Sequence, residues 1–213
     1  MYRRHYPEEH SPVLMQAGWV TWTVLILSLV VTLSTWVGTN NLTNWLRWSQ
    51  HDIAVGQWWR TITPAFLHFK SFDSLITHFL FNALWWLTLG GLIETREGPL
   101  RLILLFLLAA VIGNTTGGYF YGSYFGGLSG VCFALIGYTW LRGFQIDTYR
   151  AVVKPGLFYA SLIFMLAGFV QLVSNMADWV HLAGLVTGLL IALPFRLVAT
   201  HWPSQQQEQE KRR

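Results

Sequence analysis

Long apolar runs alternate with short polar connections along this chain, and the alternation is its dominant pattern. Six runs are long enough to cross roughly 30 Å of hydrocarbon once tilt is allowed for. They cover residues 19–37, 75–93, 100–119, 129–141, 156–173 and 179–198. The fourth run is conspicuously short. The pattern therefore predicts an all-α polytopic membrane protein, a six-transmembrane-helix bundle with a short, recessed fourth helix.

Composition agrees with a membrane location. Of the 213 residues, 53% are hydrophobic and 11% are charged, and the mean hydropathy is +0.40, outside the range of ordinary soluble domains. The net charge of +4 and the sequence pI near 9.4 raise the question of nucleic-acid binding. Because the basic residues lie at the ends of the apolar runs rather than in one patch, we expect the lipid bilayer and not nucleic acid as the partner.

The distribution of Lys and Arg among the connections predicts the topology. Setting aside the long first connection, which holds Arg47, Arg60 and Lys70, basic residues precede the first run, occur in the second and fourth connections and follow the last run. The third and fifth connections have none. Because positive charge is retained on the cytoplasmic side, we expect both termini to face the cytoplasm. The first run is too long for a signal peptide and lacks an A-x-A-like cleavage site, so we expect it to remain as a membrane helix.

The sequence indicates a single domain, because no repeat is visible and no linker is long enough to separate two cores. We expect residues 1–18 to form a short cytoplasmic segment, residues 19–198 the six-helix domain, and residues 199–213 a cytoplasmic tail. The longest connection, residues 38–74, is rich in tryptophan, which is typical of a segment lying in the outer membrane interface. These tryptophans are Trp45, Trp48, Trp58 and Trp59.

Polar residues gather at one end of three of the runs. The second, fourth and sixth runs cross the membrane in the same direction, so their first residues lie in the same leaflet. The second run opens with His78 and Asn82, whose spacing of four places both side chains on one face of a helix. The fourth run begins at Ser129, and the sixth carries His181 near its start. These residues are therefore predicted to converge.

The segment around Ser129 suits acyl-transfer chemistry. The neighbouring Gly127 and Gly130 permit an irregular backbone, and the serine falls at a helix N-terminus, where free N–H groups favour an oxyanion. Small residues at Gly130 and Gly184 allow the fourth and sixth helices to approach closely, which can bring Ser129 and His181 within hydrogen-bond distance. A serine hydroxyl needs a neighbouring base to act as a nucleophile, and neutral imidazole is suited to that role.

The remaining groups of such a site can also be assigned. His78, Asn82 and the backbone N–H of Ser129 are candidate donors to the oxyanion that forms when an amide is attacked. No carboxylate lies deep in any run, so we favour a Ser-His dyad, with Asp178 as the N-cap of the last helix unless it reaches His181. The single cysteine, Cys132, can form neither an internal disulfide nor a Cys-based metal site, and we expect no metal and no cofactor.

Each of these features also has a simpler interpretation. A Gly-x-Ser-Gly segment in a membrane helix commonly serves packing, and a serine can bond back to its own helix. His78 with Asn82 can form an interhelical clamp, and His181 can be a satisfied polar residue near the interface. Cys132 lies one turn inside the serine and is assigned to packing. Convergence in one leaflet is the observation that favours chemistry.

Five motifs follow one another in a distinctive order. They are Trp59-Arg60, His78-x-x-x-Asn82, Gly90-Gly91-x-x-Glu94-x-Arg96-x-Gly98, Gly126-Gly127-Leu128-Ser129-Gly130 and His181-x-x-Gly184-x-x-x-Gly188. In this order and on these helices they resemble the rhomboid family of intramembrane serine proteases, in particular the bacterial GlpG type. The resemblance implies Ser129 and His181 as a catalytic dyad, with His78, Asn82 and the Ser129 amide in the oxyanion hole. It also implies a transmembrane protein substrate that is unwound locally and cut near the outer face.

Phe133 departs from the family pattern, because relatives often have there a tyrosine that stacks on the catalytic histidine. With the charge pattern, the resemblance implies the bacterial inner membrane, with the active site opening to the periplasmic side. The alternative is a catalytically inactive rhomboid-like protein that binds or escorts membrane helices, which would be expected to lack the serine or the histidine. A small transporter ranks below both, because the runs show no paired broken helices and no midplane charges.

Overall fold

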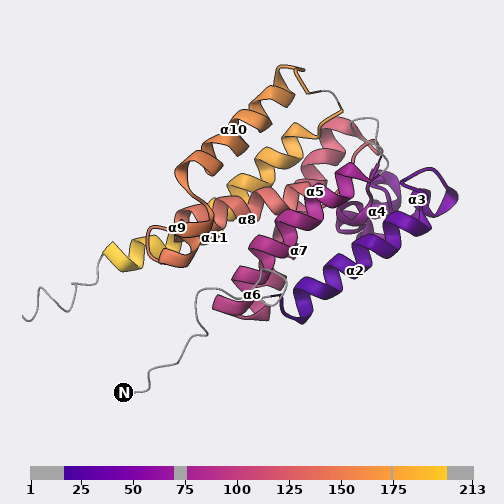
Figure 1. Ribbon diagram of the computed structural model, residues 1–213. Helices are drawn as coiled ribbons and strands as arrows, with labels where there is room; N and C mark the ends of the chain where they lie inside the picture. The colour runs from indigo at the N-terminus through magenta and orange to yellow at the C-terminus, as the bar shows by residue number, and fades with distance from the viewer. Residues whose placement is uncertain (1–16, 70–75, 174, 201–213) are drawn as a thin grey trace, which may run out of the picture.

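The computed structural model describes residues 17–69, 76–173 and 175–200, and all regular structure in these ranges is helical (Figure 1). The expected all-α class is therefore confirmed for this part of the chain. Nearly all of the predicted tail and of the segment 1–18 lies outside the described residues, although residues 199 and 200 belong to the last helix. The helices that coincide with predicted runs are α2 (Trp19–Ser34), α5 (Thr77–Trp85) with η3 (Trp86–Gly90) and α6 (Gly91–Glu97), α7 (Pro99–Tyr121), α8 (Ser129–Arg142), α10 (Pro155–Phe169) and α11 (Asp178–Thr200).

The outer surface of the bundle is apolar. Helix α7 and the segment Asp178–Phe195 of α11 are long and apolar enough to cross a membrane, and α2 and α10 are shorter apolar helices. Large aliphatic side chains are exposed on several of these helices, where a soluble protein would place polar residues. This surface suits hydrocarbon as a solvent. The exposed side chains include Ile26, Leu29, Leu33, Leu104, Leu108, Ile112, Ile163 and Leu166.

Two helices end before the predicted apolar runs do. After α2, residues 36–38 have φ values of 47°, 56° and 85°, and the amide of Val37 donates to the carbonyl of Thr32 at 3.0 Å. After α10, Gln171 has a φ of 63°. Left-handed residues at these positions satisfy the last carbonyls of a helix and end it. The runs stay apolar beyond these points, so hydrophobicity alone placed both ends too late.

Helix α8 forms the centre of the bundle. All of its residues from 130 to 139 are buried. It packs chiefly against α11 and also against α7, whereas α2 and α10 lie at opposite edges of the bundle (Figure 1). The N-terminus of α8, which begins with Ser129, is therefore held inside the protein.

The carboxylate of Glu94 in α6 caps the N-terminus of α2. It accepts hydrogen bonds from the amides of Val20 and Thr21 at 2.9 and 2.8 Å, and from the hydroxyl of Thr21 at 2.7 Å. A Cβ on Gly18 would overlap the carboxylate, so a side chain at position 18 would displace Glu94 from this cap. The first amides of a helix have no partner within the helix, and in a low-dielectric environment they need an acceptor. Glu94 therefore joins two helices through their backbones.

The first connection folds into short helices that attach to the bundle. Arg60 is 5% exposed and organises them, since its guanidinium donates to the carbonyls of Asn44 and Arg47 at 2.7 and 2.9 Å and lies 3.3 Å from Asp52. The side-chain amide of Asn114 in α7 donates to the carbonyl of Thr61, in the third of these short helices, at 2.8 Å. The connection is thus a fixed part of the structure. Its helices are α3 (Asn41–Leu46), α4 (Gln50–Ala54), η1 (Trp58–Thr61) and η2 (Thr63–Phe66).

A second cluster of polar side chains connects α6, the C-terminal part of α8 and the short helix that follows it. Glu97 accepts hydrogen bonds from the hydroxyls of Tyr138 and Tyr149 at 2.6 and 2.8 Å, and Arg142 lies 3.5 Å from the same carboxylate. Tyr149 belongs to α9 (Asp147–Val152), and its burial, with the adjacent Glu97 charge, raises the pKa of its phenol. This cluster holds α6, α8 and α9 in place.

Replacing Glu94 with glutamine should lower the free energy of unfolding by about 2 kcal/mol, because an amide nitrogen would face buried N–H donors. Thr21→Val removes only the hydroxyl bond and should cost about 1 kcal/mol. Thermal unfolding of the purified proteins in detergent measures both effects. Equal midpoints for wild type and Glu94→Gln would contradict the capping role.

Candidate active site

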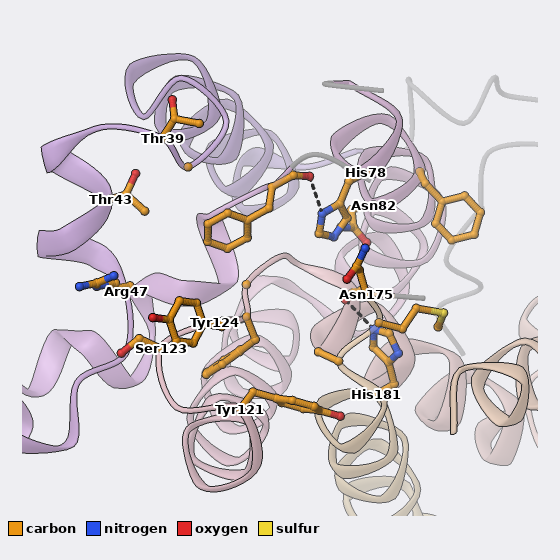
Figure 2. Close-up of a pocket in the computed structure, with 18 of the residues that line it drawn as sticks. Thr39, Thr43, Arg47, His78, Asn82, Tyr121, Ser123, Tyr124, Asn175 and His181 are labelled. Carbon is orange, nitrogen blue, oxygen red and sulfur yellow. Dashed lines mark hydrogen bonds between the residues drawn. The ribbon is translucent and has the colours of Figure 1, made fainter. Parts of the chain in front are cut away.

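Ser129 and His181 meet at the N-terminal ends of α8 and α11. The Nε2 atom of His181 lies 2.8 Å from the Oγ atom of Ser129, as the predicted contact requires (Figure 2). When the hydroxyl donates to Nε2, the proton of the neutral ring is on Nδ1. The imidazole is 5% exposed, and Phe133 stacks on it with a ring-centroid distance of 4.7 Å and an interplanar angle of 26°.

Glycines let the backbones of α8 and α11 touch. A Cβ on Gly184 would overlap the carbonyl oxygen of Gly130, and a Cβ on Gly188 would overlap that of Ala134. No side chain can be added at either position unless one helix moves, because the obstructing atom is backbone. Gly184 lies one turn after His181, so this contact sets how far the imidazole is from α8. Gly130 and Gly184 therefore position the hydrogen-bonded pair.

Asp178 does not have the role expected from the sequence. The carbonyl of Ala177 accepts the first bonds of α11, from the amides of Val180 and His181 at 2.9 and 3.1 Å, so Asp178 is the first helical residue and not the N-cap. Its carboxylate packs against Gly168 of α10, where a Cβ would overlap it. Among the described residues, neither Oδ1 of Asp178 nor Nδ1 of His181 has a hydrogen-bond partner. The side chain is directed to α10 instead of to the imidazole.

His78 and Asn82 of α5 lie against the loop that precedes Ser129. Gly127 has a φ of +115°, and a Cβ there would lie 2.6 Å from Nε2 of His78 and 3.4 Å from Nδ2 of Asn82. The glycine is needed for both its φ and the space it leaves. Asn82 is 1% exposed, and its Nδ2 has no partner among the described residues. A buried amide donor is therefore unused beside Ser129.

Whether Nε2 of His78 can donate a hydrogen bond depends on a contact of the other ring nitrogen, which the sequence did not reveal. Its Nδ1 atom lies 3.3 Å from the carbonyl oxygen of Phe69, to which only an N–H group can bond. In the neutral ring that proton leaves Nε2 with a lone pair. Nε2 donates when the ring is an imidazolium, or when the bond to Phe69 is released and the other tautomer forms.

The loop before Ser129 is attached to the first connection. The amide of Gly127 donates to the carbonyl of Pro64 at 3.0 Å, and the hydroxyl of Ser123 donates to the carbonyl of Trp48 at 2.7 Å. The first amides of α8, including that of Ser129, have no acceptor within the helix. These bonds hold the loop in place, and with it the N-terminus of α8 and its free amides.

A cavity of about 1010 Å³ contains these groups (Figure 2). His181, His78 and Asn82 lie on one side of it, and residues of α3 and around it, including Thr39, Thr43 and Arg47, lie on the other (Figure 2). Ser129, which is hydrogen-bonded to His181, also lines the cavity. No sequence motif marked α3 as part of the site, because its contribution depends on how the first connection folds. Among the described residues, no group of three or more His, Cys, Asp or Glu side chains is arranged to hold a metal ion.

Comparison with protein families identifies the domain type. The family model of the Rhomboid domain matches residues 55–197, which is more than half of the 213-residue chain. The matched segment contains all of α5 to α10 and the first part of α11. It therefore includes every residue placed at the candidate site above, apart from Trp48, those of α3 and those around α3 that line the cavity.

Gly184→Ala should destabilise the protein by about 1 to 3 kcal/mol, because the added methyl group must push α11 away from the carbonyl of Gly130. Gly156→Ala is the matched control, since a Cβ there meets no atom within 4 Å. Thermal unfolding in detergent distinguishes the two variants. Identical midpoints would show that the two backbones are not in the contact described.

Proposed function

This chain belongs to the rhomboid family, and from that premise we propose that it is an intramembrane serine endopeptidase. Members of the family are generally serine proteases that act on membrane-protein substrates within the bilayer. We assign the catalytic dyad to Ser129 and His181. The observation that carries the assignment is the 2.8 Å hydrogen bond between them.

The arrangement supports a two-step acyl transfer. Ser129 Oγ attacks the carbonyl carbon of the scissile peptide bond while Nε2 of His181 takes the hydroxyl proton. The imidazolium then gives this proton to the leaving amine, which leaves an acyl-enzyme ester on Ser129. A water molecule, deprotonated by the same nitrogen, attacks the ester and releases the second product. The serine and the neutral imidazole are regenerated.

Three donors are proposed for the oxyanion. The amide of Ser129 lies at a helix N-terminus, and Nδ2 of Asn82 is buried without a partner among the described residues. Nε2 of His78 is the third, in a protonation state that gives it a hydrogen. Stacking of Phe133 on His181 supports the imidazolium, because an aromatic face attracts a cation. This contact is suited to a dyad without a carboxylate.

The proposed architecture is a six-helix bundle of the GlpG type, formed by residues 19–198, with residues 1–18 and 199–213 as short cytoplasmic segments. Helix α8 has 14 residues and is about 20 Å long, shorter than the roughly 30 Å hydrocarbon layer. Ser129 would then lie below the outer surface, reached by water through the cavity. We propose the bacterial inner membrane, with both termini cytoplasmic and the active site opening to the periplasm.

An inactive rhomboid-like protein that binds membrane helices is the second candidate. The cavity would suit binding as well as catalysis. The hydrogen-bonded Ser129 and His181 favour the protease, because helix binding by itself requires neither residue.

Ser129→Ala and His181→Ala should each lower kcat by at least about ten-thousandfold, since either change removes the activated nucleophile. The assay is cleavage of a single-span model substrate in liposomes, followed by mass spectrometry of the products. Ser161→Ala on α10 and His51→Ala on α4 are matched controls that should retain activity. Cleavage that persists in Ser129→Ala would refute the mechanism.

Asn82→Ala should lower kcat by about a hundredfold with little change in KM, because the lost donor acts on charge that develops only in the transition state. Steady-state kinetics in the same liposome assay separate the two constants. An unchanged kcat would remove Asn82 from the oxyanion hole.

A further inference from the structure

Helix α3 presents a polar face to the cavity and an apolar face to its surroundings. Asn41, Asn44 and Arg47 line the cavity, and their spacing of three places them along one side of the helix. Leu42 and Trp45 are 41% and 60% exposed and do not line it. The side of the cavity opposite Ser129 is therefore hydrophilic.

Among the described residues that line the cavity, Arg47 is the only arginine, and there is no lysine, aspartate or glutamate. Its guanidinium makes no hydrogen bond or ion pair with any residue in the described ranges. The neighbouring Arg60 is the opposite case, since its guanidinium is held by Gln57, by Asp52 and by two backbone carbonyls. One arginine organises the first connection, and the other is free to bind something else.

The backbone at Arg47 is fixed although its side chain is free. Its amide donates to the carbonyl of Thr43 at 2.9 Å, and its own carbonyl accepts from Arg60 at 2.9 Å. Trp48, the next residue, is 8% exposed and accepts a hydrogen bond from Ser123 in the loop before Ser129. The backbone that carries the Arg47 guanidinium is therefore fixed to the first connection, which also holds the loop before Ser129.

A guanidinium without a partner, beside side-chain amides, can bind a carboxylate. Arginine binds carboxylates through paired N–H donors, and such charge-assisted bonds are stronger than neutral ones. The amides of Asn41 and Asn44 add neutral donors on the same side of the cavity. No described lining residue is a carboxylate, so nothing in this part of the chain competes for the cation.

We propose that Arg47, with Asn41 and Asn44, forms a subsite that binds an acidic side chain of the substrate near the scissile bond. This inference rests on the proposed protease function. The enzyme then prefers substrates that have Asp or Glu at one position along the extended segment, and rejects Lys there. Arg47 is a specificity determinant and takes no part in the bond-breaking steps.

The test uses single-span substrates in liposomes of neutral lipid, with Asp or the isosteric Asn placed in turn at each position around the cleaved bond. We expect one position at which Asp raises kcat/KM about tenfold over Asn, mainly through KM. Arg47→Gln should abolish this preference and leave the Asn substrates unaffected. Arg47→Glu should reverse it, so that Lys at the same position becomes the better substrate. Arg150→Gln, which changes an exposed arginine of α9, is the control.

The possible contrary results are distinct. If wild type cleaves the Asn series and Asp gives no advantage at any position, the subsite is refuted and the protease function stands. If Arg47→Gln slows all substrates equally, and the effect depends on added anionic lipid, Arg47 binds lipid phosphate and the subsite is refuted. If wild type cleaves no substrate of either series, the protease function fails and the subsite fails with it.

Discussion

The contact between the backbones of α8 and α11 is the constraint on which the rest of the site depends. Helices in hydrocarbon gain no hydrophobic energy from associating, because lipid tails are as apolar as the side chains, so close packing must hold them together. Gly184 and Gly188 provide it by lying directly on the carbonyls of Gly130 and Ala134. Any side chain at these positions would separate Ser129 from His181.

Buried polar side chains connect the other segments of the bundle. Several of them do so by hydrogen bonding to backbone amides and carbonyls. Glu94 holds the first amides of α2, and Arg60 holds carbonyls of the first connection. These groups are expensive to bury, and full hydrogen bonding offsets that cost. Several buried polar atoms in the described ranges lack a partner, and among them Nδ2 of Asn82 and Nδ1 of His181 belong to residues that line the cavity. Unused donors are thus present where the proposed reaction develops charge.

The electrostatic character of the cavity is consistent with that reaction. Its described lining includes two imidazoles and one arginine but no carboxylate. Such a cavity favours an oxyanion, and it leaves the His181 imidazolium to be supported by Phe133 instead of by an anion. The carboxylate nearest in sequence, Asp178, is directed to Gly168 of α10. A dyad therefore fits the arrangement of charges better than a triad.

The sequence by itself determined the helical class and the rhomboid family, because both depend on local features. A helix must be apolar over a fixed length to cross hydrocarbon, and motifs such as Gly126-Gly127-Leu128-Ser129-Gly130 are read directly from the chain. It also indicated that Ser129, His181, His78 and Asn82 would converge, although their catalytic roles stay predictions.

The tertiary structure decided what depends on neighbours distant in sequence. The ends of α2 and α10 were set by left-handed residues, and the carboxylate of Asp178 was drawn to α10 instead of capping α11. The hydrogen bond from His78 to Phe69, and the place of Arg47 in the cavity, follow from the folding of the first connection. No local pattern encodes these contacts, because each joins segments whose approach is set by packing elsewhere in the bundle.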